Sequence, residues 1–319
     1  MSLLSTVPIK DYLVAPTHYL RGILLSFATA LLWGFLPIFL KITLQGFHAG
    51  TIAWFRFVFA FLILALILQW NEHEPLRILR RPPWMGILGG ACLSINYYWV
   101  TVGVDLSGPS NMAVLIQTAS VFLVLAGVYV FRERLAFRQV LGMIVVASGL
   151  LLFFYDQQSR IQERGNYYYA DFLIILAALA WVGYMISQKF LSRKYGAQSL
   201  NMLVYAVATF TLIGGVEWSD FTRAGLTAWL SLIFCGFNTL LAYGALAEAV
   251  KYIPLALISV IISLNPLITL WGMKTLPEIG FAGLQADPVG AIGYWGGAVA
   301  VTGVVLVVYR RTPPPEEAG

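Results

Sequence analysis

The stretch PSNMAVLIQTASVFLVLAGVYVFRE, from Pro109 to Glu133, is matched in frame by a second stretch of the same length, 25 residues, from Pro254 to Glu278. The two share a proline at the start, a glutamate at the end, and an isoleucine, a leucine and a glycine between them. Further landmarks recur at nearly constant offsets, which predicts a chain built of two copies of one unit. They are Trp33 and Lys41 with Trp181 and Lys189, Tyr98 with Tyr243, and Gly142 and Gly149 with Gly296 and Gly303.

The composition is that of a membrane protein. Hydrophobic residues make up 59% of the chain and charged residues 11%, against about 45–50% and about 25% in soluble domains. Apolar runs of about 20 residues, the length that crosses a bilayer as a helix, cover almost the whole sequence. The ten predicted spans are 22–43, 49–70, 84–104, 109–131, 138–155, 170–190, 198–217, 226–247, 254–274 and 289–309.

These spans predict an all-α integral membrane protein with ten transmembrane helices. Because five is an odd number, the second copy of a five-helix unit must enter the bilayer from the opposite side, so the repeat is expected to be inverted. The predicted organisation has four parts: an N-terminal cytoplasmic segment at 1–19, a first repeat at 20–155, a second repeat at 170–310 and a disordered cytoplasmic tail at 311–319.

Neither a removable signal peptide nor a disulfide or metal site is predicted. Arg21 opens the first span and no small-residue cleavage site follows a short apolar core, which argues against a removable signal peptide. Cys92 and Cys235 fall inside spans and do not correspond in the repeat, so we interpret them as small apolar residues and expect no disulfide, metal or cofactor.

The distribution of Lys and Arg predicts the orientation. With the N-terminus in the cytoplasm, the inside segments hold 14 of these residues and the outside segments 5, and Arg56 lies within a span. Such a bias favours both termini in the cytoplasm. It also accounts for the net charge of +5, so no nucleic-acid partner is indicated.

Arg56 lies well within a predicted span, away from its ends, and it has no charged counterpart in the second copy, where Val204 stands. A buried arginine in a bilayer is costly, which leaves two interpretations: the side chain snorkels to the interface, or it binds an anion or backbone carbonyls inside the bundle.

Polar and aromatic residues gather on six other spans and predict a substrate cavity. With Arg56, the predicted lining is Trp33, Asn96, Tyr97, Tyr98, Asn111, Gln117, Trp181, Tyr184, Gln188, Asn238, Tyr243 and Asn265. For each aromatic residue, ordinary packing between helices is the competing interpretation. Prolines that remove a backbone donor mark candidate hinges. These are Pro37, Pro109, Pro254 and Pro266.

The order of these features resembles the EamA-type members of the drug/metabolite transporter superfamily. The similarity rests on WGFLPIFLK at the start, Arg56 in the second helix, a tyrosine-rich third helix, a fourth helix that begins at Pro109 and ends in FRERL, and a glycine-spaced fifth helix. It implies a ten-helix inverted-repeat carrier that works by alternating access, often an exporter of amino acids or other small metabolites in a prokaryotic inner membrane. The second copy departs from this pattern, since it lacks matches to Pro37 and Arg56.

The position of the acidic residues bears on coupling. All fifteen lie in loops or at the ends of spans, whereas a proton relay normally needs an ionisable group within the membrane. Glu248 is the best remaining candidate for coupling, although an interfacial ion pair with Lys251 is the favoured interpretation. We therefore predict facilitated transport or exchange in preference to obligate proton coupling.

The predicted lining suits a small amphipathic or zwitterionic substrate, because it offers aromatic surfaces, neutral amides and one cation. Membrane lipids are the other expected partner. An enzyme is not predicted, since no HExxH or GxSxG motif and no facing pair of acids occurs. A flippase or exporter of lipid-linked or drug-like cargo on the same scaffold is the alternative. Substrate, direction and oligomeric state do not follow from the sequence.

Overall fold

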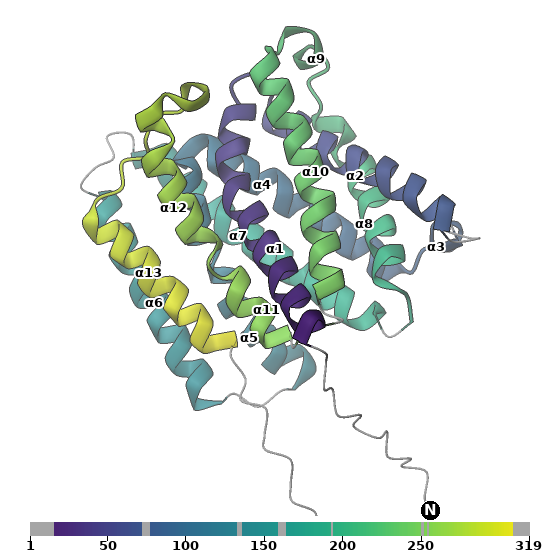
Figure 1. Cartoon of the computed structure of the whole chain (residues 1–319), viewed down its shortest axis with the longest axis horizontal. Coiled ribbons are helices and arrows are strands. Elements are labelled where there is room, and N and C mark those ends of the chain that lie inside the picture. Colours follow the sequence, from purple (N-terminus) through teal and green to yellow (C-terminus); the bar gives the residue numbers. More distant parts are fainter. Residues whose placement is uncertain are drawn as a thin grey trace, which may run out of the picture.

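The computed structural model describes residues 16–71, 77–132, 136–158, 164–192, 194–249, 252–253 and 255–308. Every regular element in this part of the chain is helical, and the long helices run side by side as a bundle (Figure 1). The predicted tail and most of the predicted N-terminal segment, as well as Pro254, lie outside the described residues.

Eight of the described helices are long and apolar enough to cross a bilayer by length and composition. They are α1 (Pro16–Thr43), α2 (Ala49–Asn71), α4 (Trp84–Leu115), α6 (Phe137–Gln158), α7 (Arg164–Leu191), α8 (Ala197–Leu212), α10 (Leu226–Ala249) and α13 (Ala291–Val308). Shorter helices are α3 (Arg77–Arg80), α5 (Thr118–Phe131), α9 (Asp220–Arg223), α11 (Leu255–Ile262) and α12 (Asn265–Thr275).

Two of the ten predicted spans are divided, and they are the two stretches that repeat in the sequence. In 109–131, hydrogen bonds of the i→i+3 type at Gln117 separate the end of α4 from α5. In 254–274, the same pattern at Leu264 separates α11 from α12, just before the predicted break at Asn265 and Pro266. A short 3₁₀ turn inside a helix often marks a hinge. The count of ten spans includes both divided segments and stays a prediction.

Gly142 and Gly149 of α6 and Gly296 and Gly303 of α13 bring the two helices into backbone contact, because residues without a side chain let helix backbones approach closely. A Cβ added at Gly142 would lie 2.7 Å from the backbone nitrogen of Val307, and one added at Gly296 would lie 2.6 Å from that of Phe153. Likewise, a Cβ at Gly149 would lie 2.7 Å from the carbonyl oxygen of Gly296. The two helices therefore pack antiparallel, with their backbones in direct contact at these glycines.

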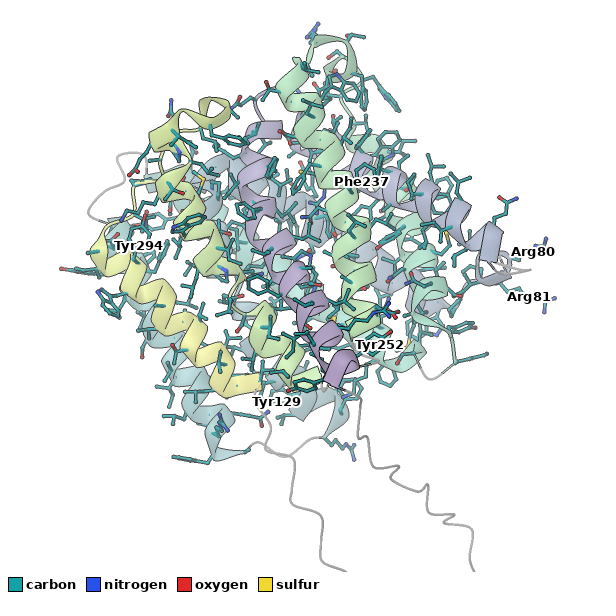
Figure 2. All side chains as sticks on the ribbon, viewed as in Figure 1. Arg80, Arg81, Tyr129, Phe237, Tyr252 and Tyr294 are labelled. Carbon is teal, nitrogen blue, oxygen red and sulfur yellow. The ribbon has the colours of Figure 1, made fainter. Side chains whose placement is uncertain are left out.

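The outer surface of the bundle is apolar, as a lipid-facing surface must be. Tyr129 is 80% exposed, and Phe237 also lies on the surface (Figure 2). Arg80 and Arg81 lie at one edge, where the chain passes from α2 to α4.

Candidate functional site

Arg56, in the second turn of α2, lies inside the bundle and is only 1% exposed. Its Nε donates a hydrogen bond to Thr239 Oγ1 of α10 at 3.1 Å, and its guanidinium carbon lies 4.1 Å from the centre of the Tyr97 ring of α4. Among the described residues, no carboxylate lies within ion-pair distance of this guanidinium. The snorkelling interpretation is therefore wrong, and the cation is held by a hydroxyl and an aromatic face.

Five predicted aromatic residues converge near Arg56 from four helices. The ring centre of Tyr243 lies 5.5 Å from that of Trp33 and 6.4 Å from that of Tyr184. Tyr97, Tyr184, Trp181 and Tyr243 belong to one hydrophobic cluster that also contains Phe57 of α2. We call Arg56 with Trp33, Tyr97, Trp181, Tyr184 and Tyr243 the Arg56 cluster.

Small residues let the helices that carry this cluster approach closely. A Cβ added at Gly89 of α4 would lie 2.5 Å from Ser187 Oγ of α7, and one added at Gly236 of α10 would lie 2.9 Å from the Phe59 ring of α2. Asn96 Nδ2 donates to the Ala177 carbonyl oxygen at 2.9 Å and so joins α4 to α7. Asn96 thus serves the helix contact that positions the cluster.

The other predicted amides are not gathered in one place. Asn238 is 1% exposed and its Nδ2 donates to the Leu32 carbonyl oxygen of α1, while its Oδ1 has no hydrogen-bond partner among the described residues. Gln117 is buried at the division between α4 and α5, and its Nε2 is likewise unpartnered there. Gln188 and Asn265 are half-buried. The contacts that these four amides make could not be predicted from the sequence alone.

Two predicted cavity residues lie away from the cluster. Tyr98 is 39% exposed, because consecutive residues of a helix point in directions about 100° apart and Tyr97 already faces inward. Asn111 donates from Nδ2 to Asp171 Oδ1 at 2.6 Å, near the first turns of α7. Neither residue is therefore part of the Arg56 cluster.

Three acids at the ends of spans are buried, a feature that the sequence does not announce. Asp156, Asp171 and Asp220 are 3%, 9% and 4% exposed. Asp156 accepts a hydrogen bond from the backbone N–H of Gly290 at 2.7 Å. Glu248 lies near the opposite ends of the helices, where it accepts from the Tyr252 hydroxyl and lies 3.9 Å from Arg21 Nη2.

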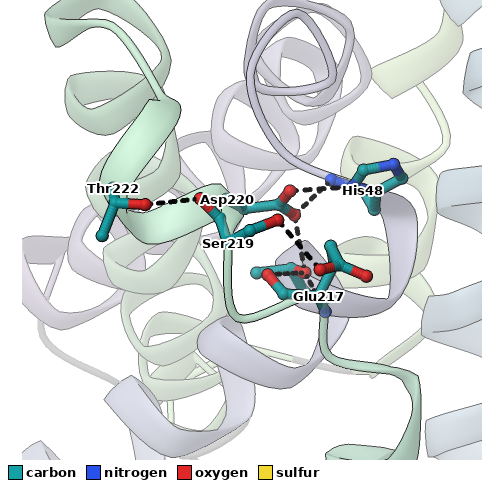
Figure 3. A network of polar contacts seen from close by, with 6 residues as sticks. His48, Glu217, Ser219, Asp220 and Thr222 are labelled. Atoms are coloured by element: carbon teal, nitrogen blue, oxygen red, sulfur yellow. Dashed lines mark hydrogen bonds and ion pairs between the residues drawn. The ribbon is translucent and has the colours of Figure 1, made fainter.

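Asp220 shows how such an acid works (Figure 3). Its carboxylate accepts hydrogen bonds from the backbone N–H of His48 at 2.8 Å and from Thr51 Oγ1 at 2.8 Å, and its Oδ1 lies 2.8 Å from His48 Nδ1. Thr51 Oγ1 in turn accepts from the backbone N–H of Glu217 at 3.0 Å. The first turn of α2, the helix that carries Arg56, is thus capped by Asp220, which is distant in the sequence.

We expect Asp220→Asn to lower the free energy of unfolding by about 0.5–2 kcal/mol, the usual value of an N-terminal cap. Burial alone would raise the pKa of Asp220, but hydrogen bonds from His48 and Thr51 outweigh it and lower that pKa below 3.8. The cap therefore contributes fully above the ordinary aspartate pKa and is lost as the pH falls through the lowered value. Thermal unfolding of both proteins from pH 2 to pH 7 tests this, since the difference should shrink below the ordinary aspartate pKa, and equal melting temperatures at pH 7 would contradict it.

The predicted hinges differ in what they do. Pro37 lies inside α1, which continues past it to Thr43. Pro109 follows a true interruption of α4, because Gly108 has φ +87° and ψ 164°. Pro266 stands in the first turn of α12, where a missing N–H costs nothing. In the described part of the chain, no group of three or more His, Cys, Asp or Glu side chains is arranged to hold a metal ion.

Comparisons with known proteins agree with this architecture. The model of the EamA-like transporter family matches residues 20–155 and 168–273. The chain is 33% identical over 295 residues to the Escherichia coli K12 protein named uncharacterized inner membrane transporter YhbE, covering 89% of this chain and 90% of that one. It is 30% identical over 288 residues to an uncharacterized transporter of Haemophilus influenzae, covering 90% and 94%.

A solved crystal structure has the same fold. It superposes with a TM-score of 0.62 at 15% sequence identity, and the match covers 89% of this chain and 95% of the other. The family match spans well over half of the chain, and the apolar helices are those of a multi-pass membrane protein. The chain belongs to the EamA-like transporter family and is a membrane transporter.

Proposed function

We propose that the protein carries small amphipathic metabolites with a carboxylate, such as amino acids or related compounds, by alternating access. The observation that carries this proposal is Arg56, a fully buried cation with no carboxylate partner among the described residues. Burying a charge without a partner is costly. A ligand anion that pairs with Arg56 between aromatic walls recovers that cost during each cycle.

The symmetry of the α6 and α13 contact supports alternating access. Adding 154 to Gly142 gives Gly296, and subtracting 154 from its contact Gly303 gives Gly149; the contact between Gly296 and Gly149 is also observed. Antiparallel helices that repeat their contacts in this way are related by a local twofold axis perpendicular to them. We infer that this axis lies in the membrane plane and relates the two halves as an inverted repeat.

We further propose that the protein works by facilitated transport or exchange and that it exports its substrate. It is proposed to lie in a prokaryotic inner membrane with both termini in the cytoplasm. The acids of the described chain lie near the ends of helices, with none in the Arg56 cluster, which supports transport without an obligate proton step. Glu248 remains the residue to test for coupling.

The alternative function is a flippase or exporter of lipid-linked or drug-like cargo. It is favoured by an apolar depression beside α1, lined by Leu20, Leu24 and Leu25 with Arg21 at its edge. Such a depression faces the surface of the bundle and suits an alkyl chain better than a zwitterion.

The two functions are separated by a thermal-shift screen of the purified protein against amino acids, polyamines, drugs and lipid precursors, followed by exchange in proteoliposomes. We expect stabilisation and exchange with a compound that carries a carboxylate, with or without an imposed pH gradient. Uptake that requires the gradient and disappears in Glu248→Gln would contradict the facilitated mechanism. Stabilisation by lipid precursors alone would establish the alternative.

A further inference from the structure

The interruption of α4 leaves backbone carbonyls without their helical partners, and another helix supplies a substitute. Pro109 has no N–H to donate to the carbonyl of Asp105, and Gly108, just before it, has left the helical conformation. Lys41, near the end of α1, donates from Nζ to the Asp105 carbonyl oxygen at 2.9 Å and lies 3.5 Å from that of Val104. Its ammonium thus occupies the negative end of the first helical segment.

The amides on the other side of the interruption are paired with carboxylates. The backbone N–H of Ser110 donates to Asp287 Oδ2 at 2.8 Å, and a Cβ added at Gly108 would lie 2.5 Å from Asp287 Oδ1. The side-chain amide of the next residue, Asn111, donates from Nδ2 to Asp171 Oδ1 of α7. The free carbonyls before the interruption therefore face the positive charge of Lys41, and the free N–H after it faces the negative charge of Asp287.

This arrangement ties together helices that carry the Arg56 cluster. Lys41 is on the helix of Trp33, the interruption is on the helix of Tyr97, and Asp171 is on the helix of Tyr184. The loop that carries Asp287 leads into α13 and also holds Gly290 against Asp156 of α6. From Tyr97 to Ser110 the rise along α4 is about 20 Å, so the contacts lie near the end of the bundle and not within the cluster.

We propose that Lys41 and Asp287 form a charge clamp on the α4 interruption that closes this end of the transporter and must release for the end to open. This inference rests on the proposed alternating-access function. The clamp acts through backbone groups and is not a simple ion pair, because Lys41 binds carbonyls and Asp287 binds an amide. A positioning role of this kind predicts that the two charges are not interchangeable.

The test measures access to a buried reporter near the clamp, and it needs no substrate. Thr101 of α4 is 0% exposed. In the full-length chain with Cys92→Ala and Cys235→Ala, Thr101→Cys is treated with a membrane-impermeant thiol reagent in spheroplasts and in inverted vesicles. We expect Lys41→Met and Asp287→Asn each to raise the labelling rate about tenfold from the side of Lys41 only, as loss of one charge-assisted hydrogen bond implies.

Two further variants distinguish the clamp from other roles. Lys41→Arg retains a donor and is expected to restore slow labelling. The double variant Lys41→Asp with Asp287→Lys keeps one charge of each sign but puts the wrong charge at each helix end, so it is expected to label as fast as the single variants. Slow labelling in the double variant, or unchanged labelling in both single variants, overturns the proposal.

The same variants distinguish a folding defect from a failure of the clamp, and a failure of the clamp from a failure of the transport proposal. Asp287→Asn keeps an acceptor oxygen and is the milder variant, so it carries the test if Lys41→Met gives no monodisperse protein. If no carboxylate substrate is found but labelling rises as expected, the proposed substrate is wrong and the clamp stands. If exchange proceeds at the wild-type rate with unchanged labelling in Asp287→Asn, the clamp is wrong and the transport proposal stands.

Discussion

Arg56→Met is expected to reduce exchange of the carboxylate substrate by about 10- to 100-fold, the effect of losing a hydrogen bond to a charged group worth about 1.5–3 kcal/mol. The same substitution is expected to leave the melting temperature unchanged or raise it. The reason is that Arg56 is buried without a carboxylate partner, so the folded protein gains little from its charge. Thr239 is not orphaned by the change, because its hydroxyl also donates to the Cys235 carbonyl oxygen at 3.0 Å.

Two matched variants refine this result. Arg56→Lys keeps the charge but loses the planar guanidinium over Tyr97, and we expect an intermediate rate. Thr239→Val removes the 3.1 Å hydrogen bond to Nε, together with the hydrogen bond from the hydroxyl to the Cys235 carbonyl oxygen, and a loss of less than tenfold is expected. Proteoliposome exchange and thermal unfolding are measured on the same preparations. An Arg56→Met protein that melts several degrees lower yet exchanges normally would show that Arg56 is structural.

The sequence predicts those features whose partners follow from periodicity. The glycine pairs at 142 and 149 and at 296 and 303 lie on one face of their helices, so their contact across α6 and α13 can be anticipated. The division before Pro266 follows from the missing N–H. Because consecutive residues of a helix point about 100° apart, Tyr97 and Tyr98 cannot both face the cluster, and this follows from the sequence once the helix is assigned.

The capping contacts could not be predicted, because their partners are far apart in the chain. Asp220 and His48 are 172 residues apart, and Asp287 and Ser110 are 177 apart. The available signal is indirect: α2 begins without an acidic residue in its first turn, so an acceptor must come from elsewhere. Nothing in the sequence says which loop supplies it. The division at Gln117 was equally hidden, since no proline or glycine stands there.

Gly149→Leu is expected to give no monodisperse protein, and Gly149→Ala to lower the free energy of unfolding by about 1–3 kcal/mol through overpacking. An added Cβ at this position meets backbone atoms of Ala300 and Gly296, which cannot rotate away as a side chain can. The helices must separate along the whole contact to admit it. Thermal unfolding in detergent, followed by size-exclusion chromatography, measures both effects.

Gly244 provides the matched control, because it also lies in a spanning helix but an added Cβ there meets nothing within 4 Å. Gly244→Ala should be neutral or stabilising by up to about 1 kcal/mol, the helix propensity difference between the two residues. The proposed inverted repeat adds a stricter requirement: Gly303→Ala, whose Cβ would lie 2.9 Å from the Gly142 carbonyl oxygen, must cost as much as Gly149→Ala within about 0.5 kcal/mol. If the two substitutions lower the free energy of unfolding by unequal amounts, the glycines of α6 and α13 are not equivalent in packing. The proposed twofold relation between the halves would then fail at the contact where it is best defined.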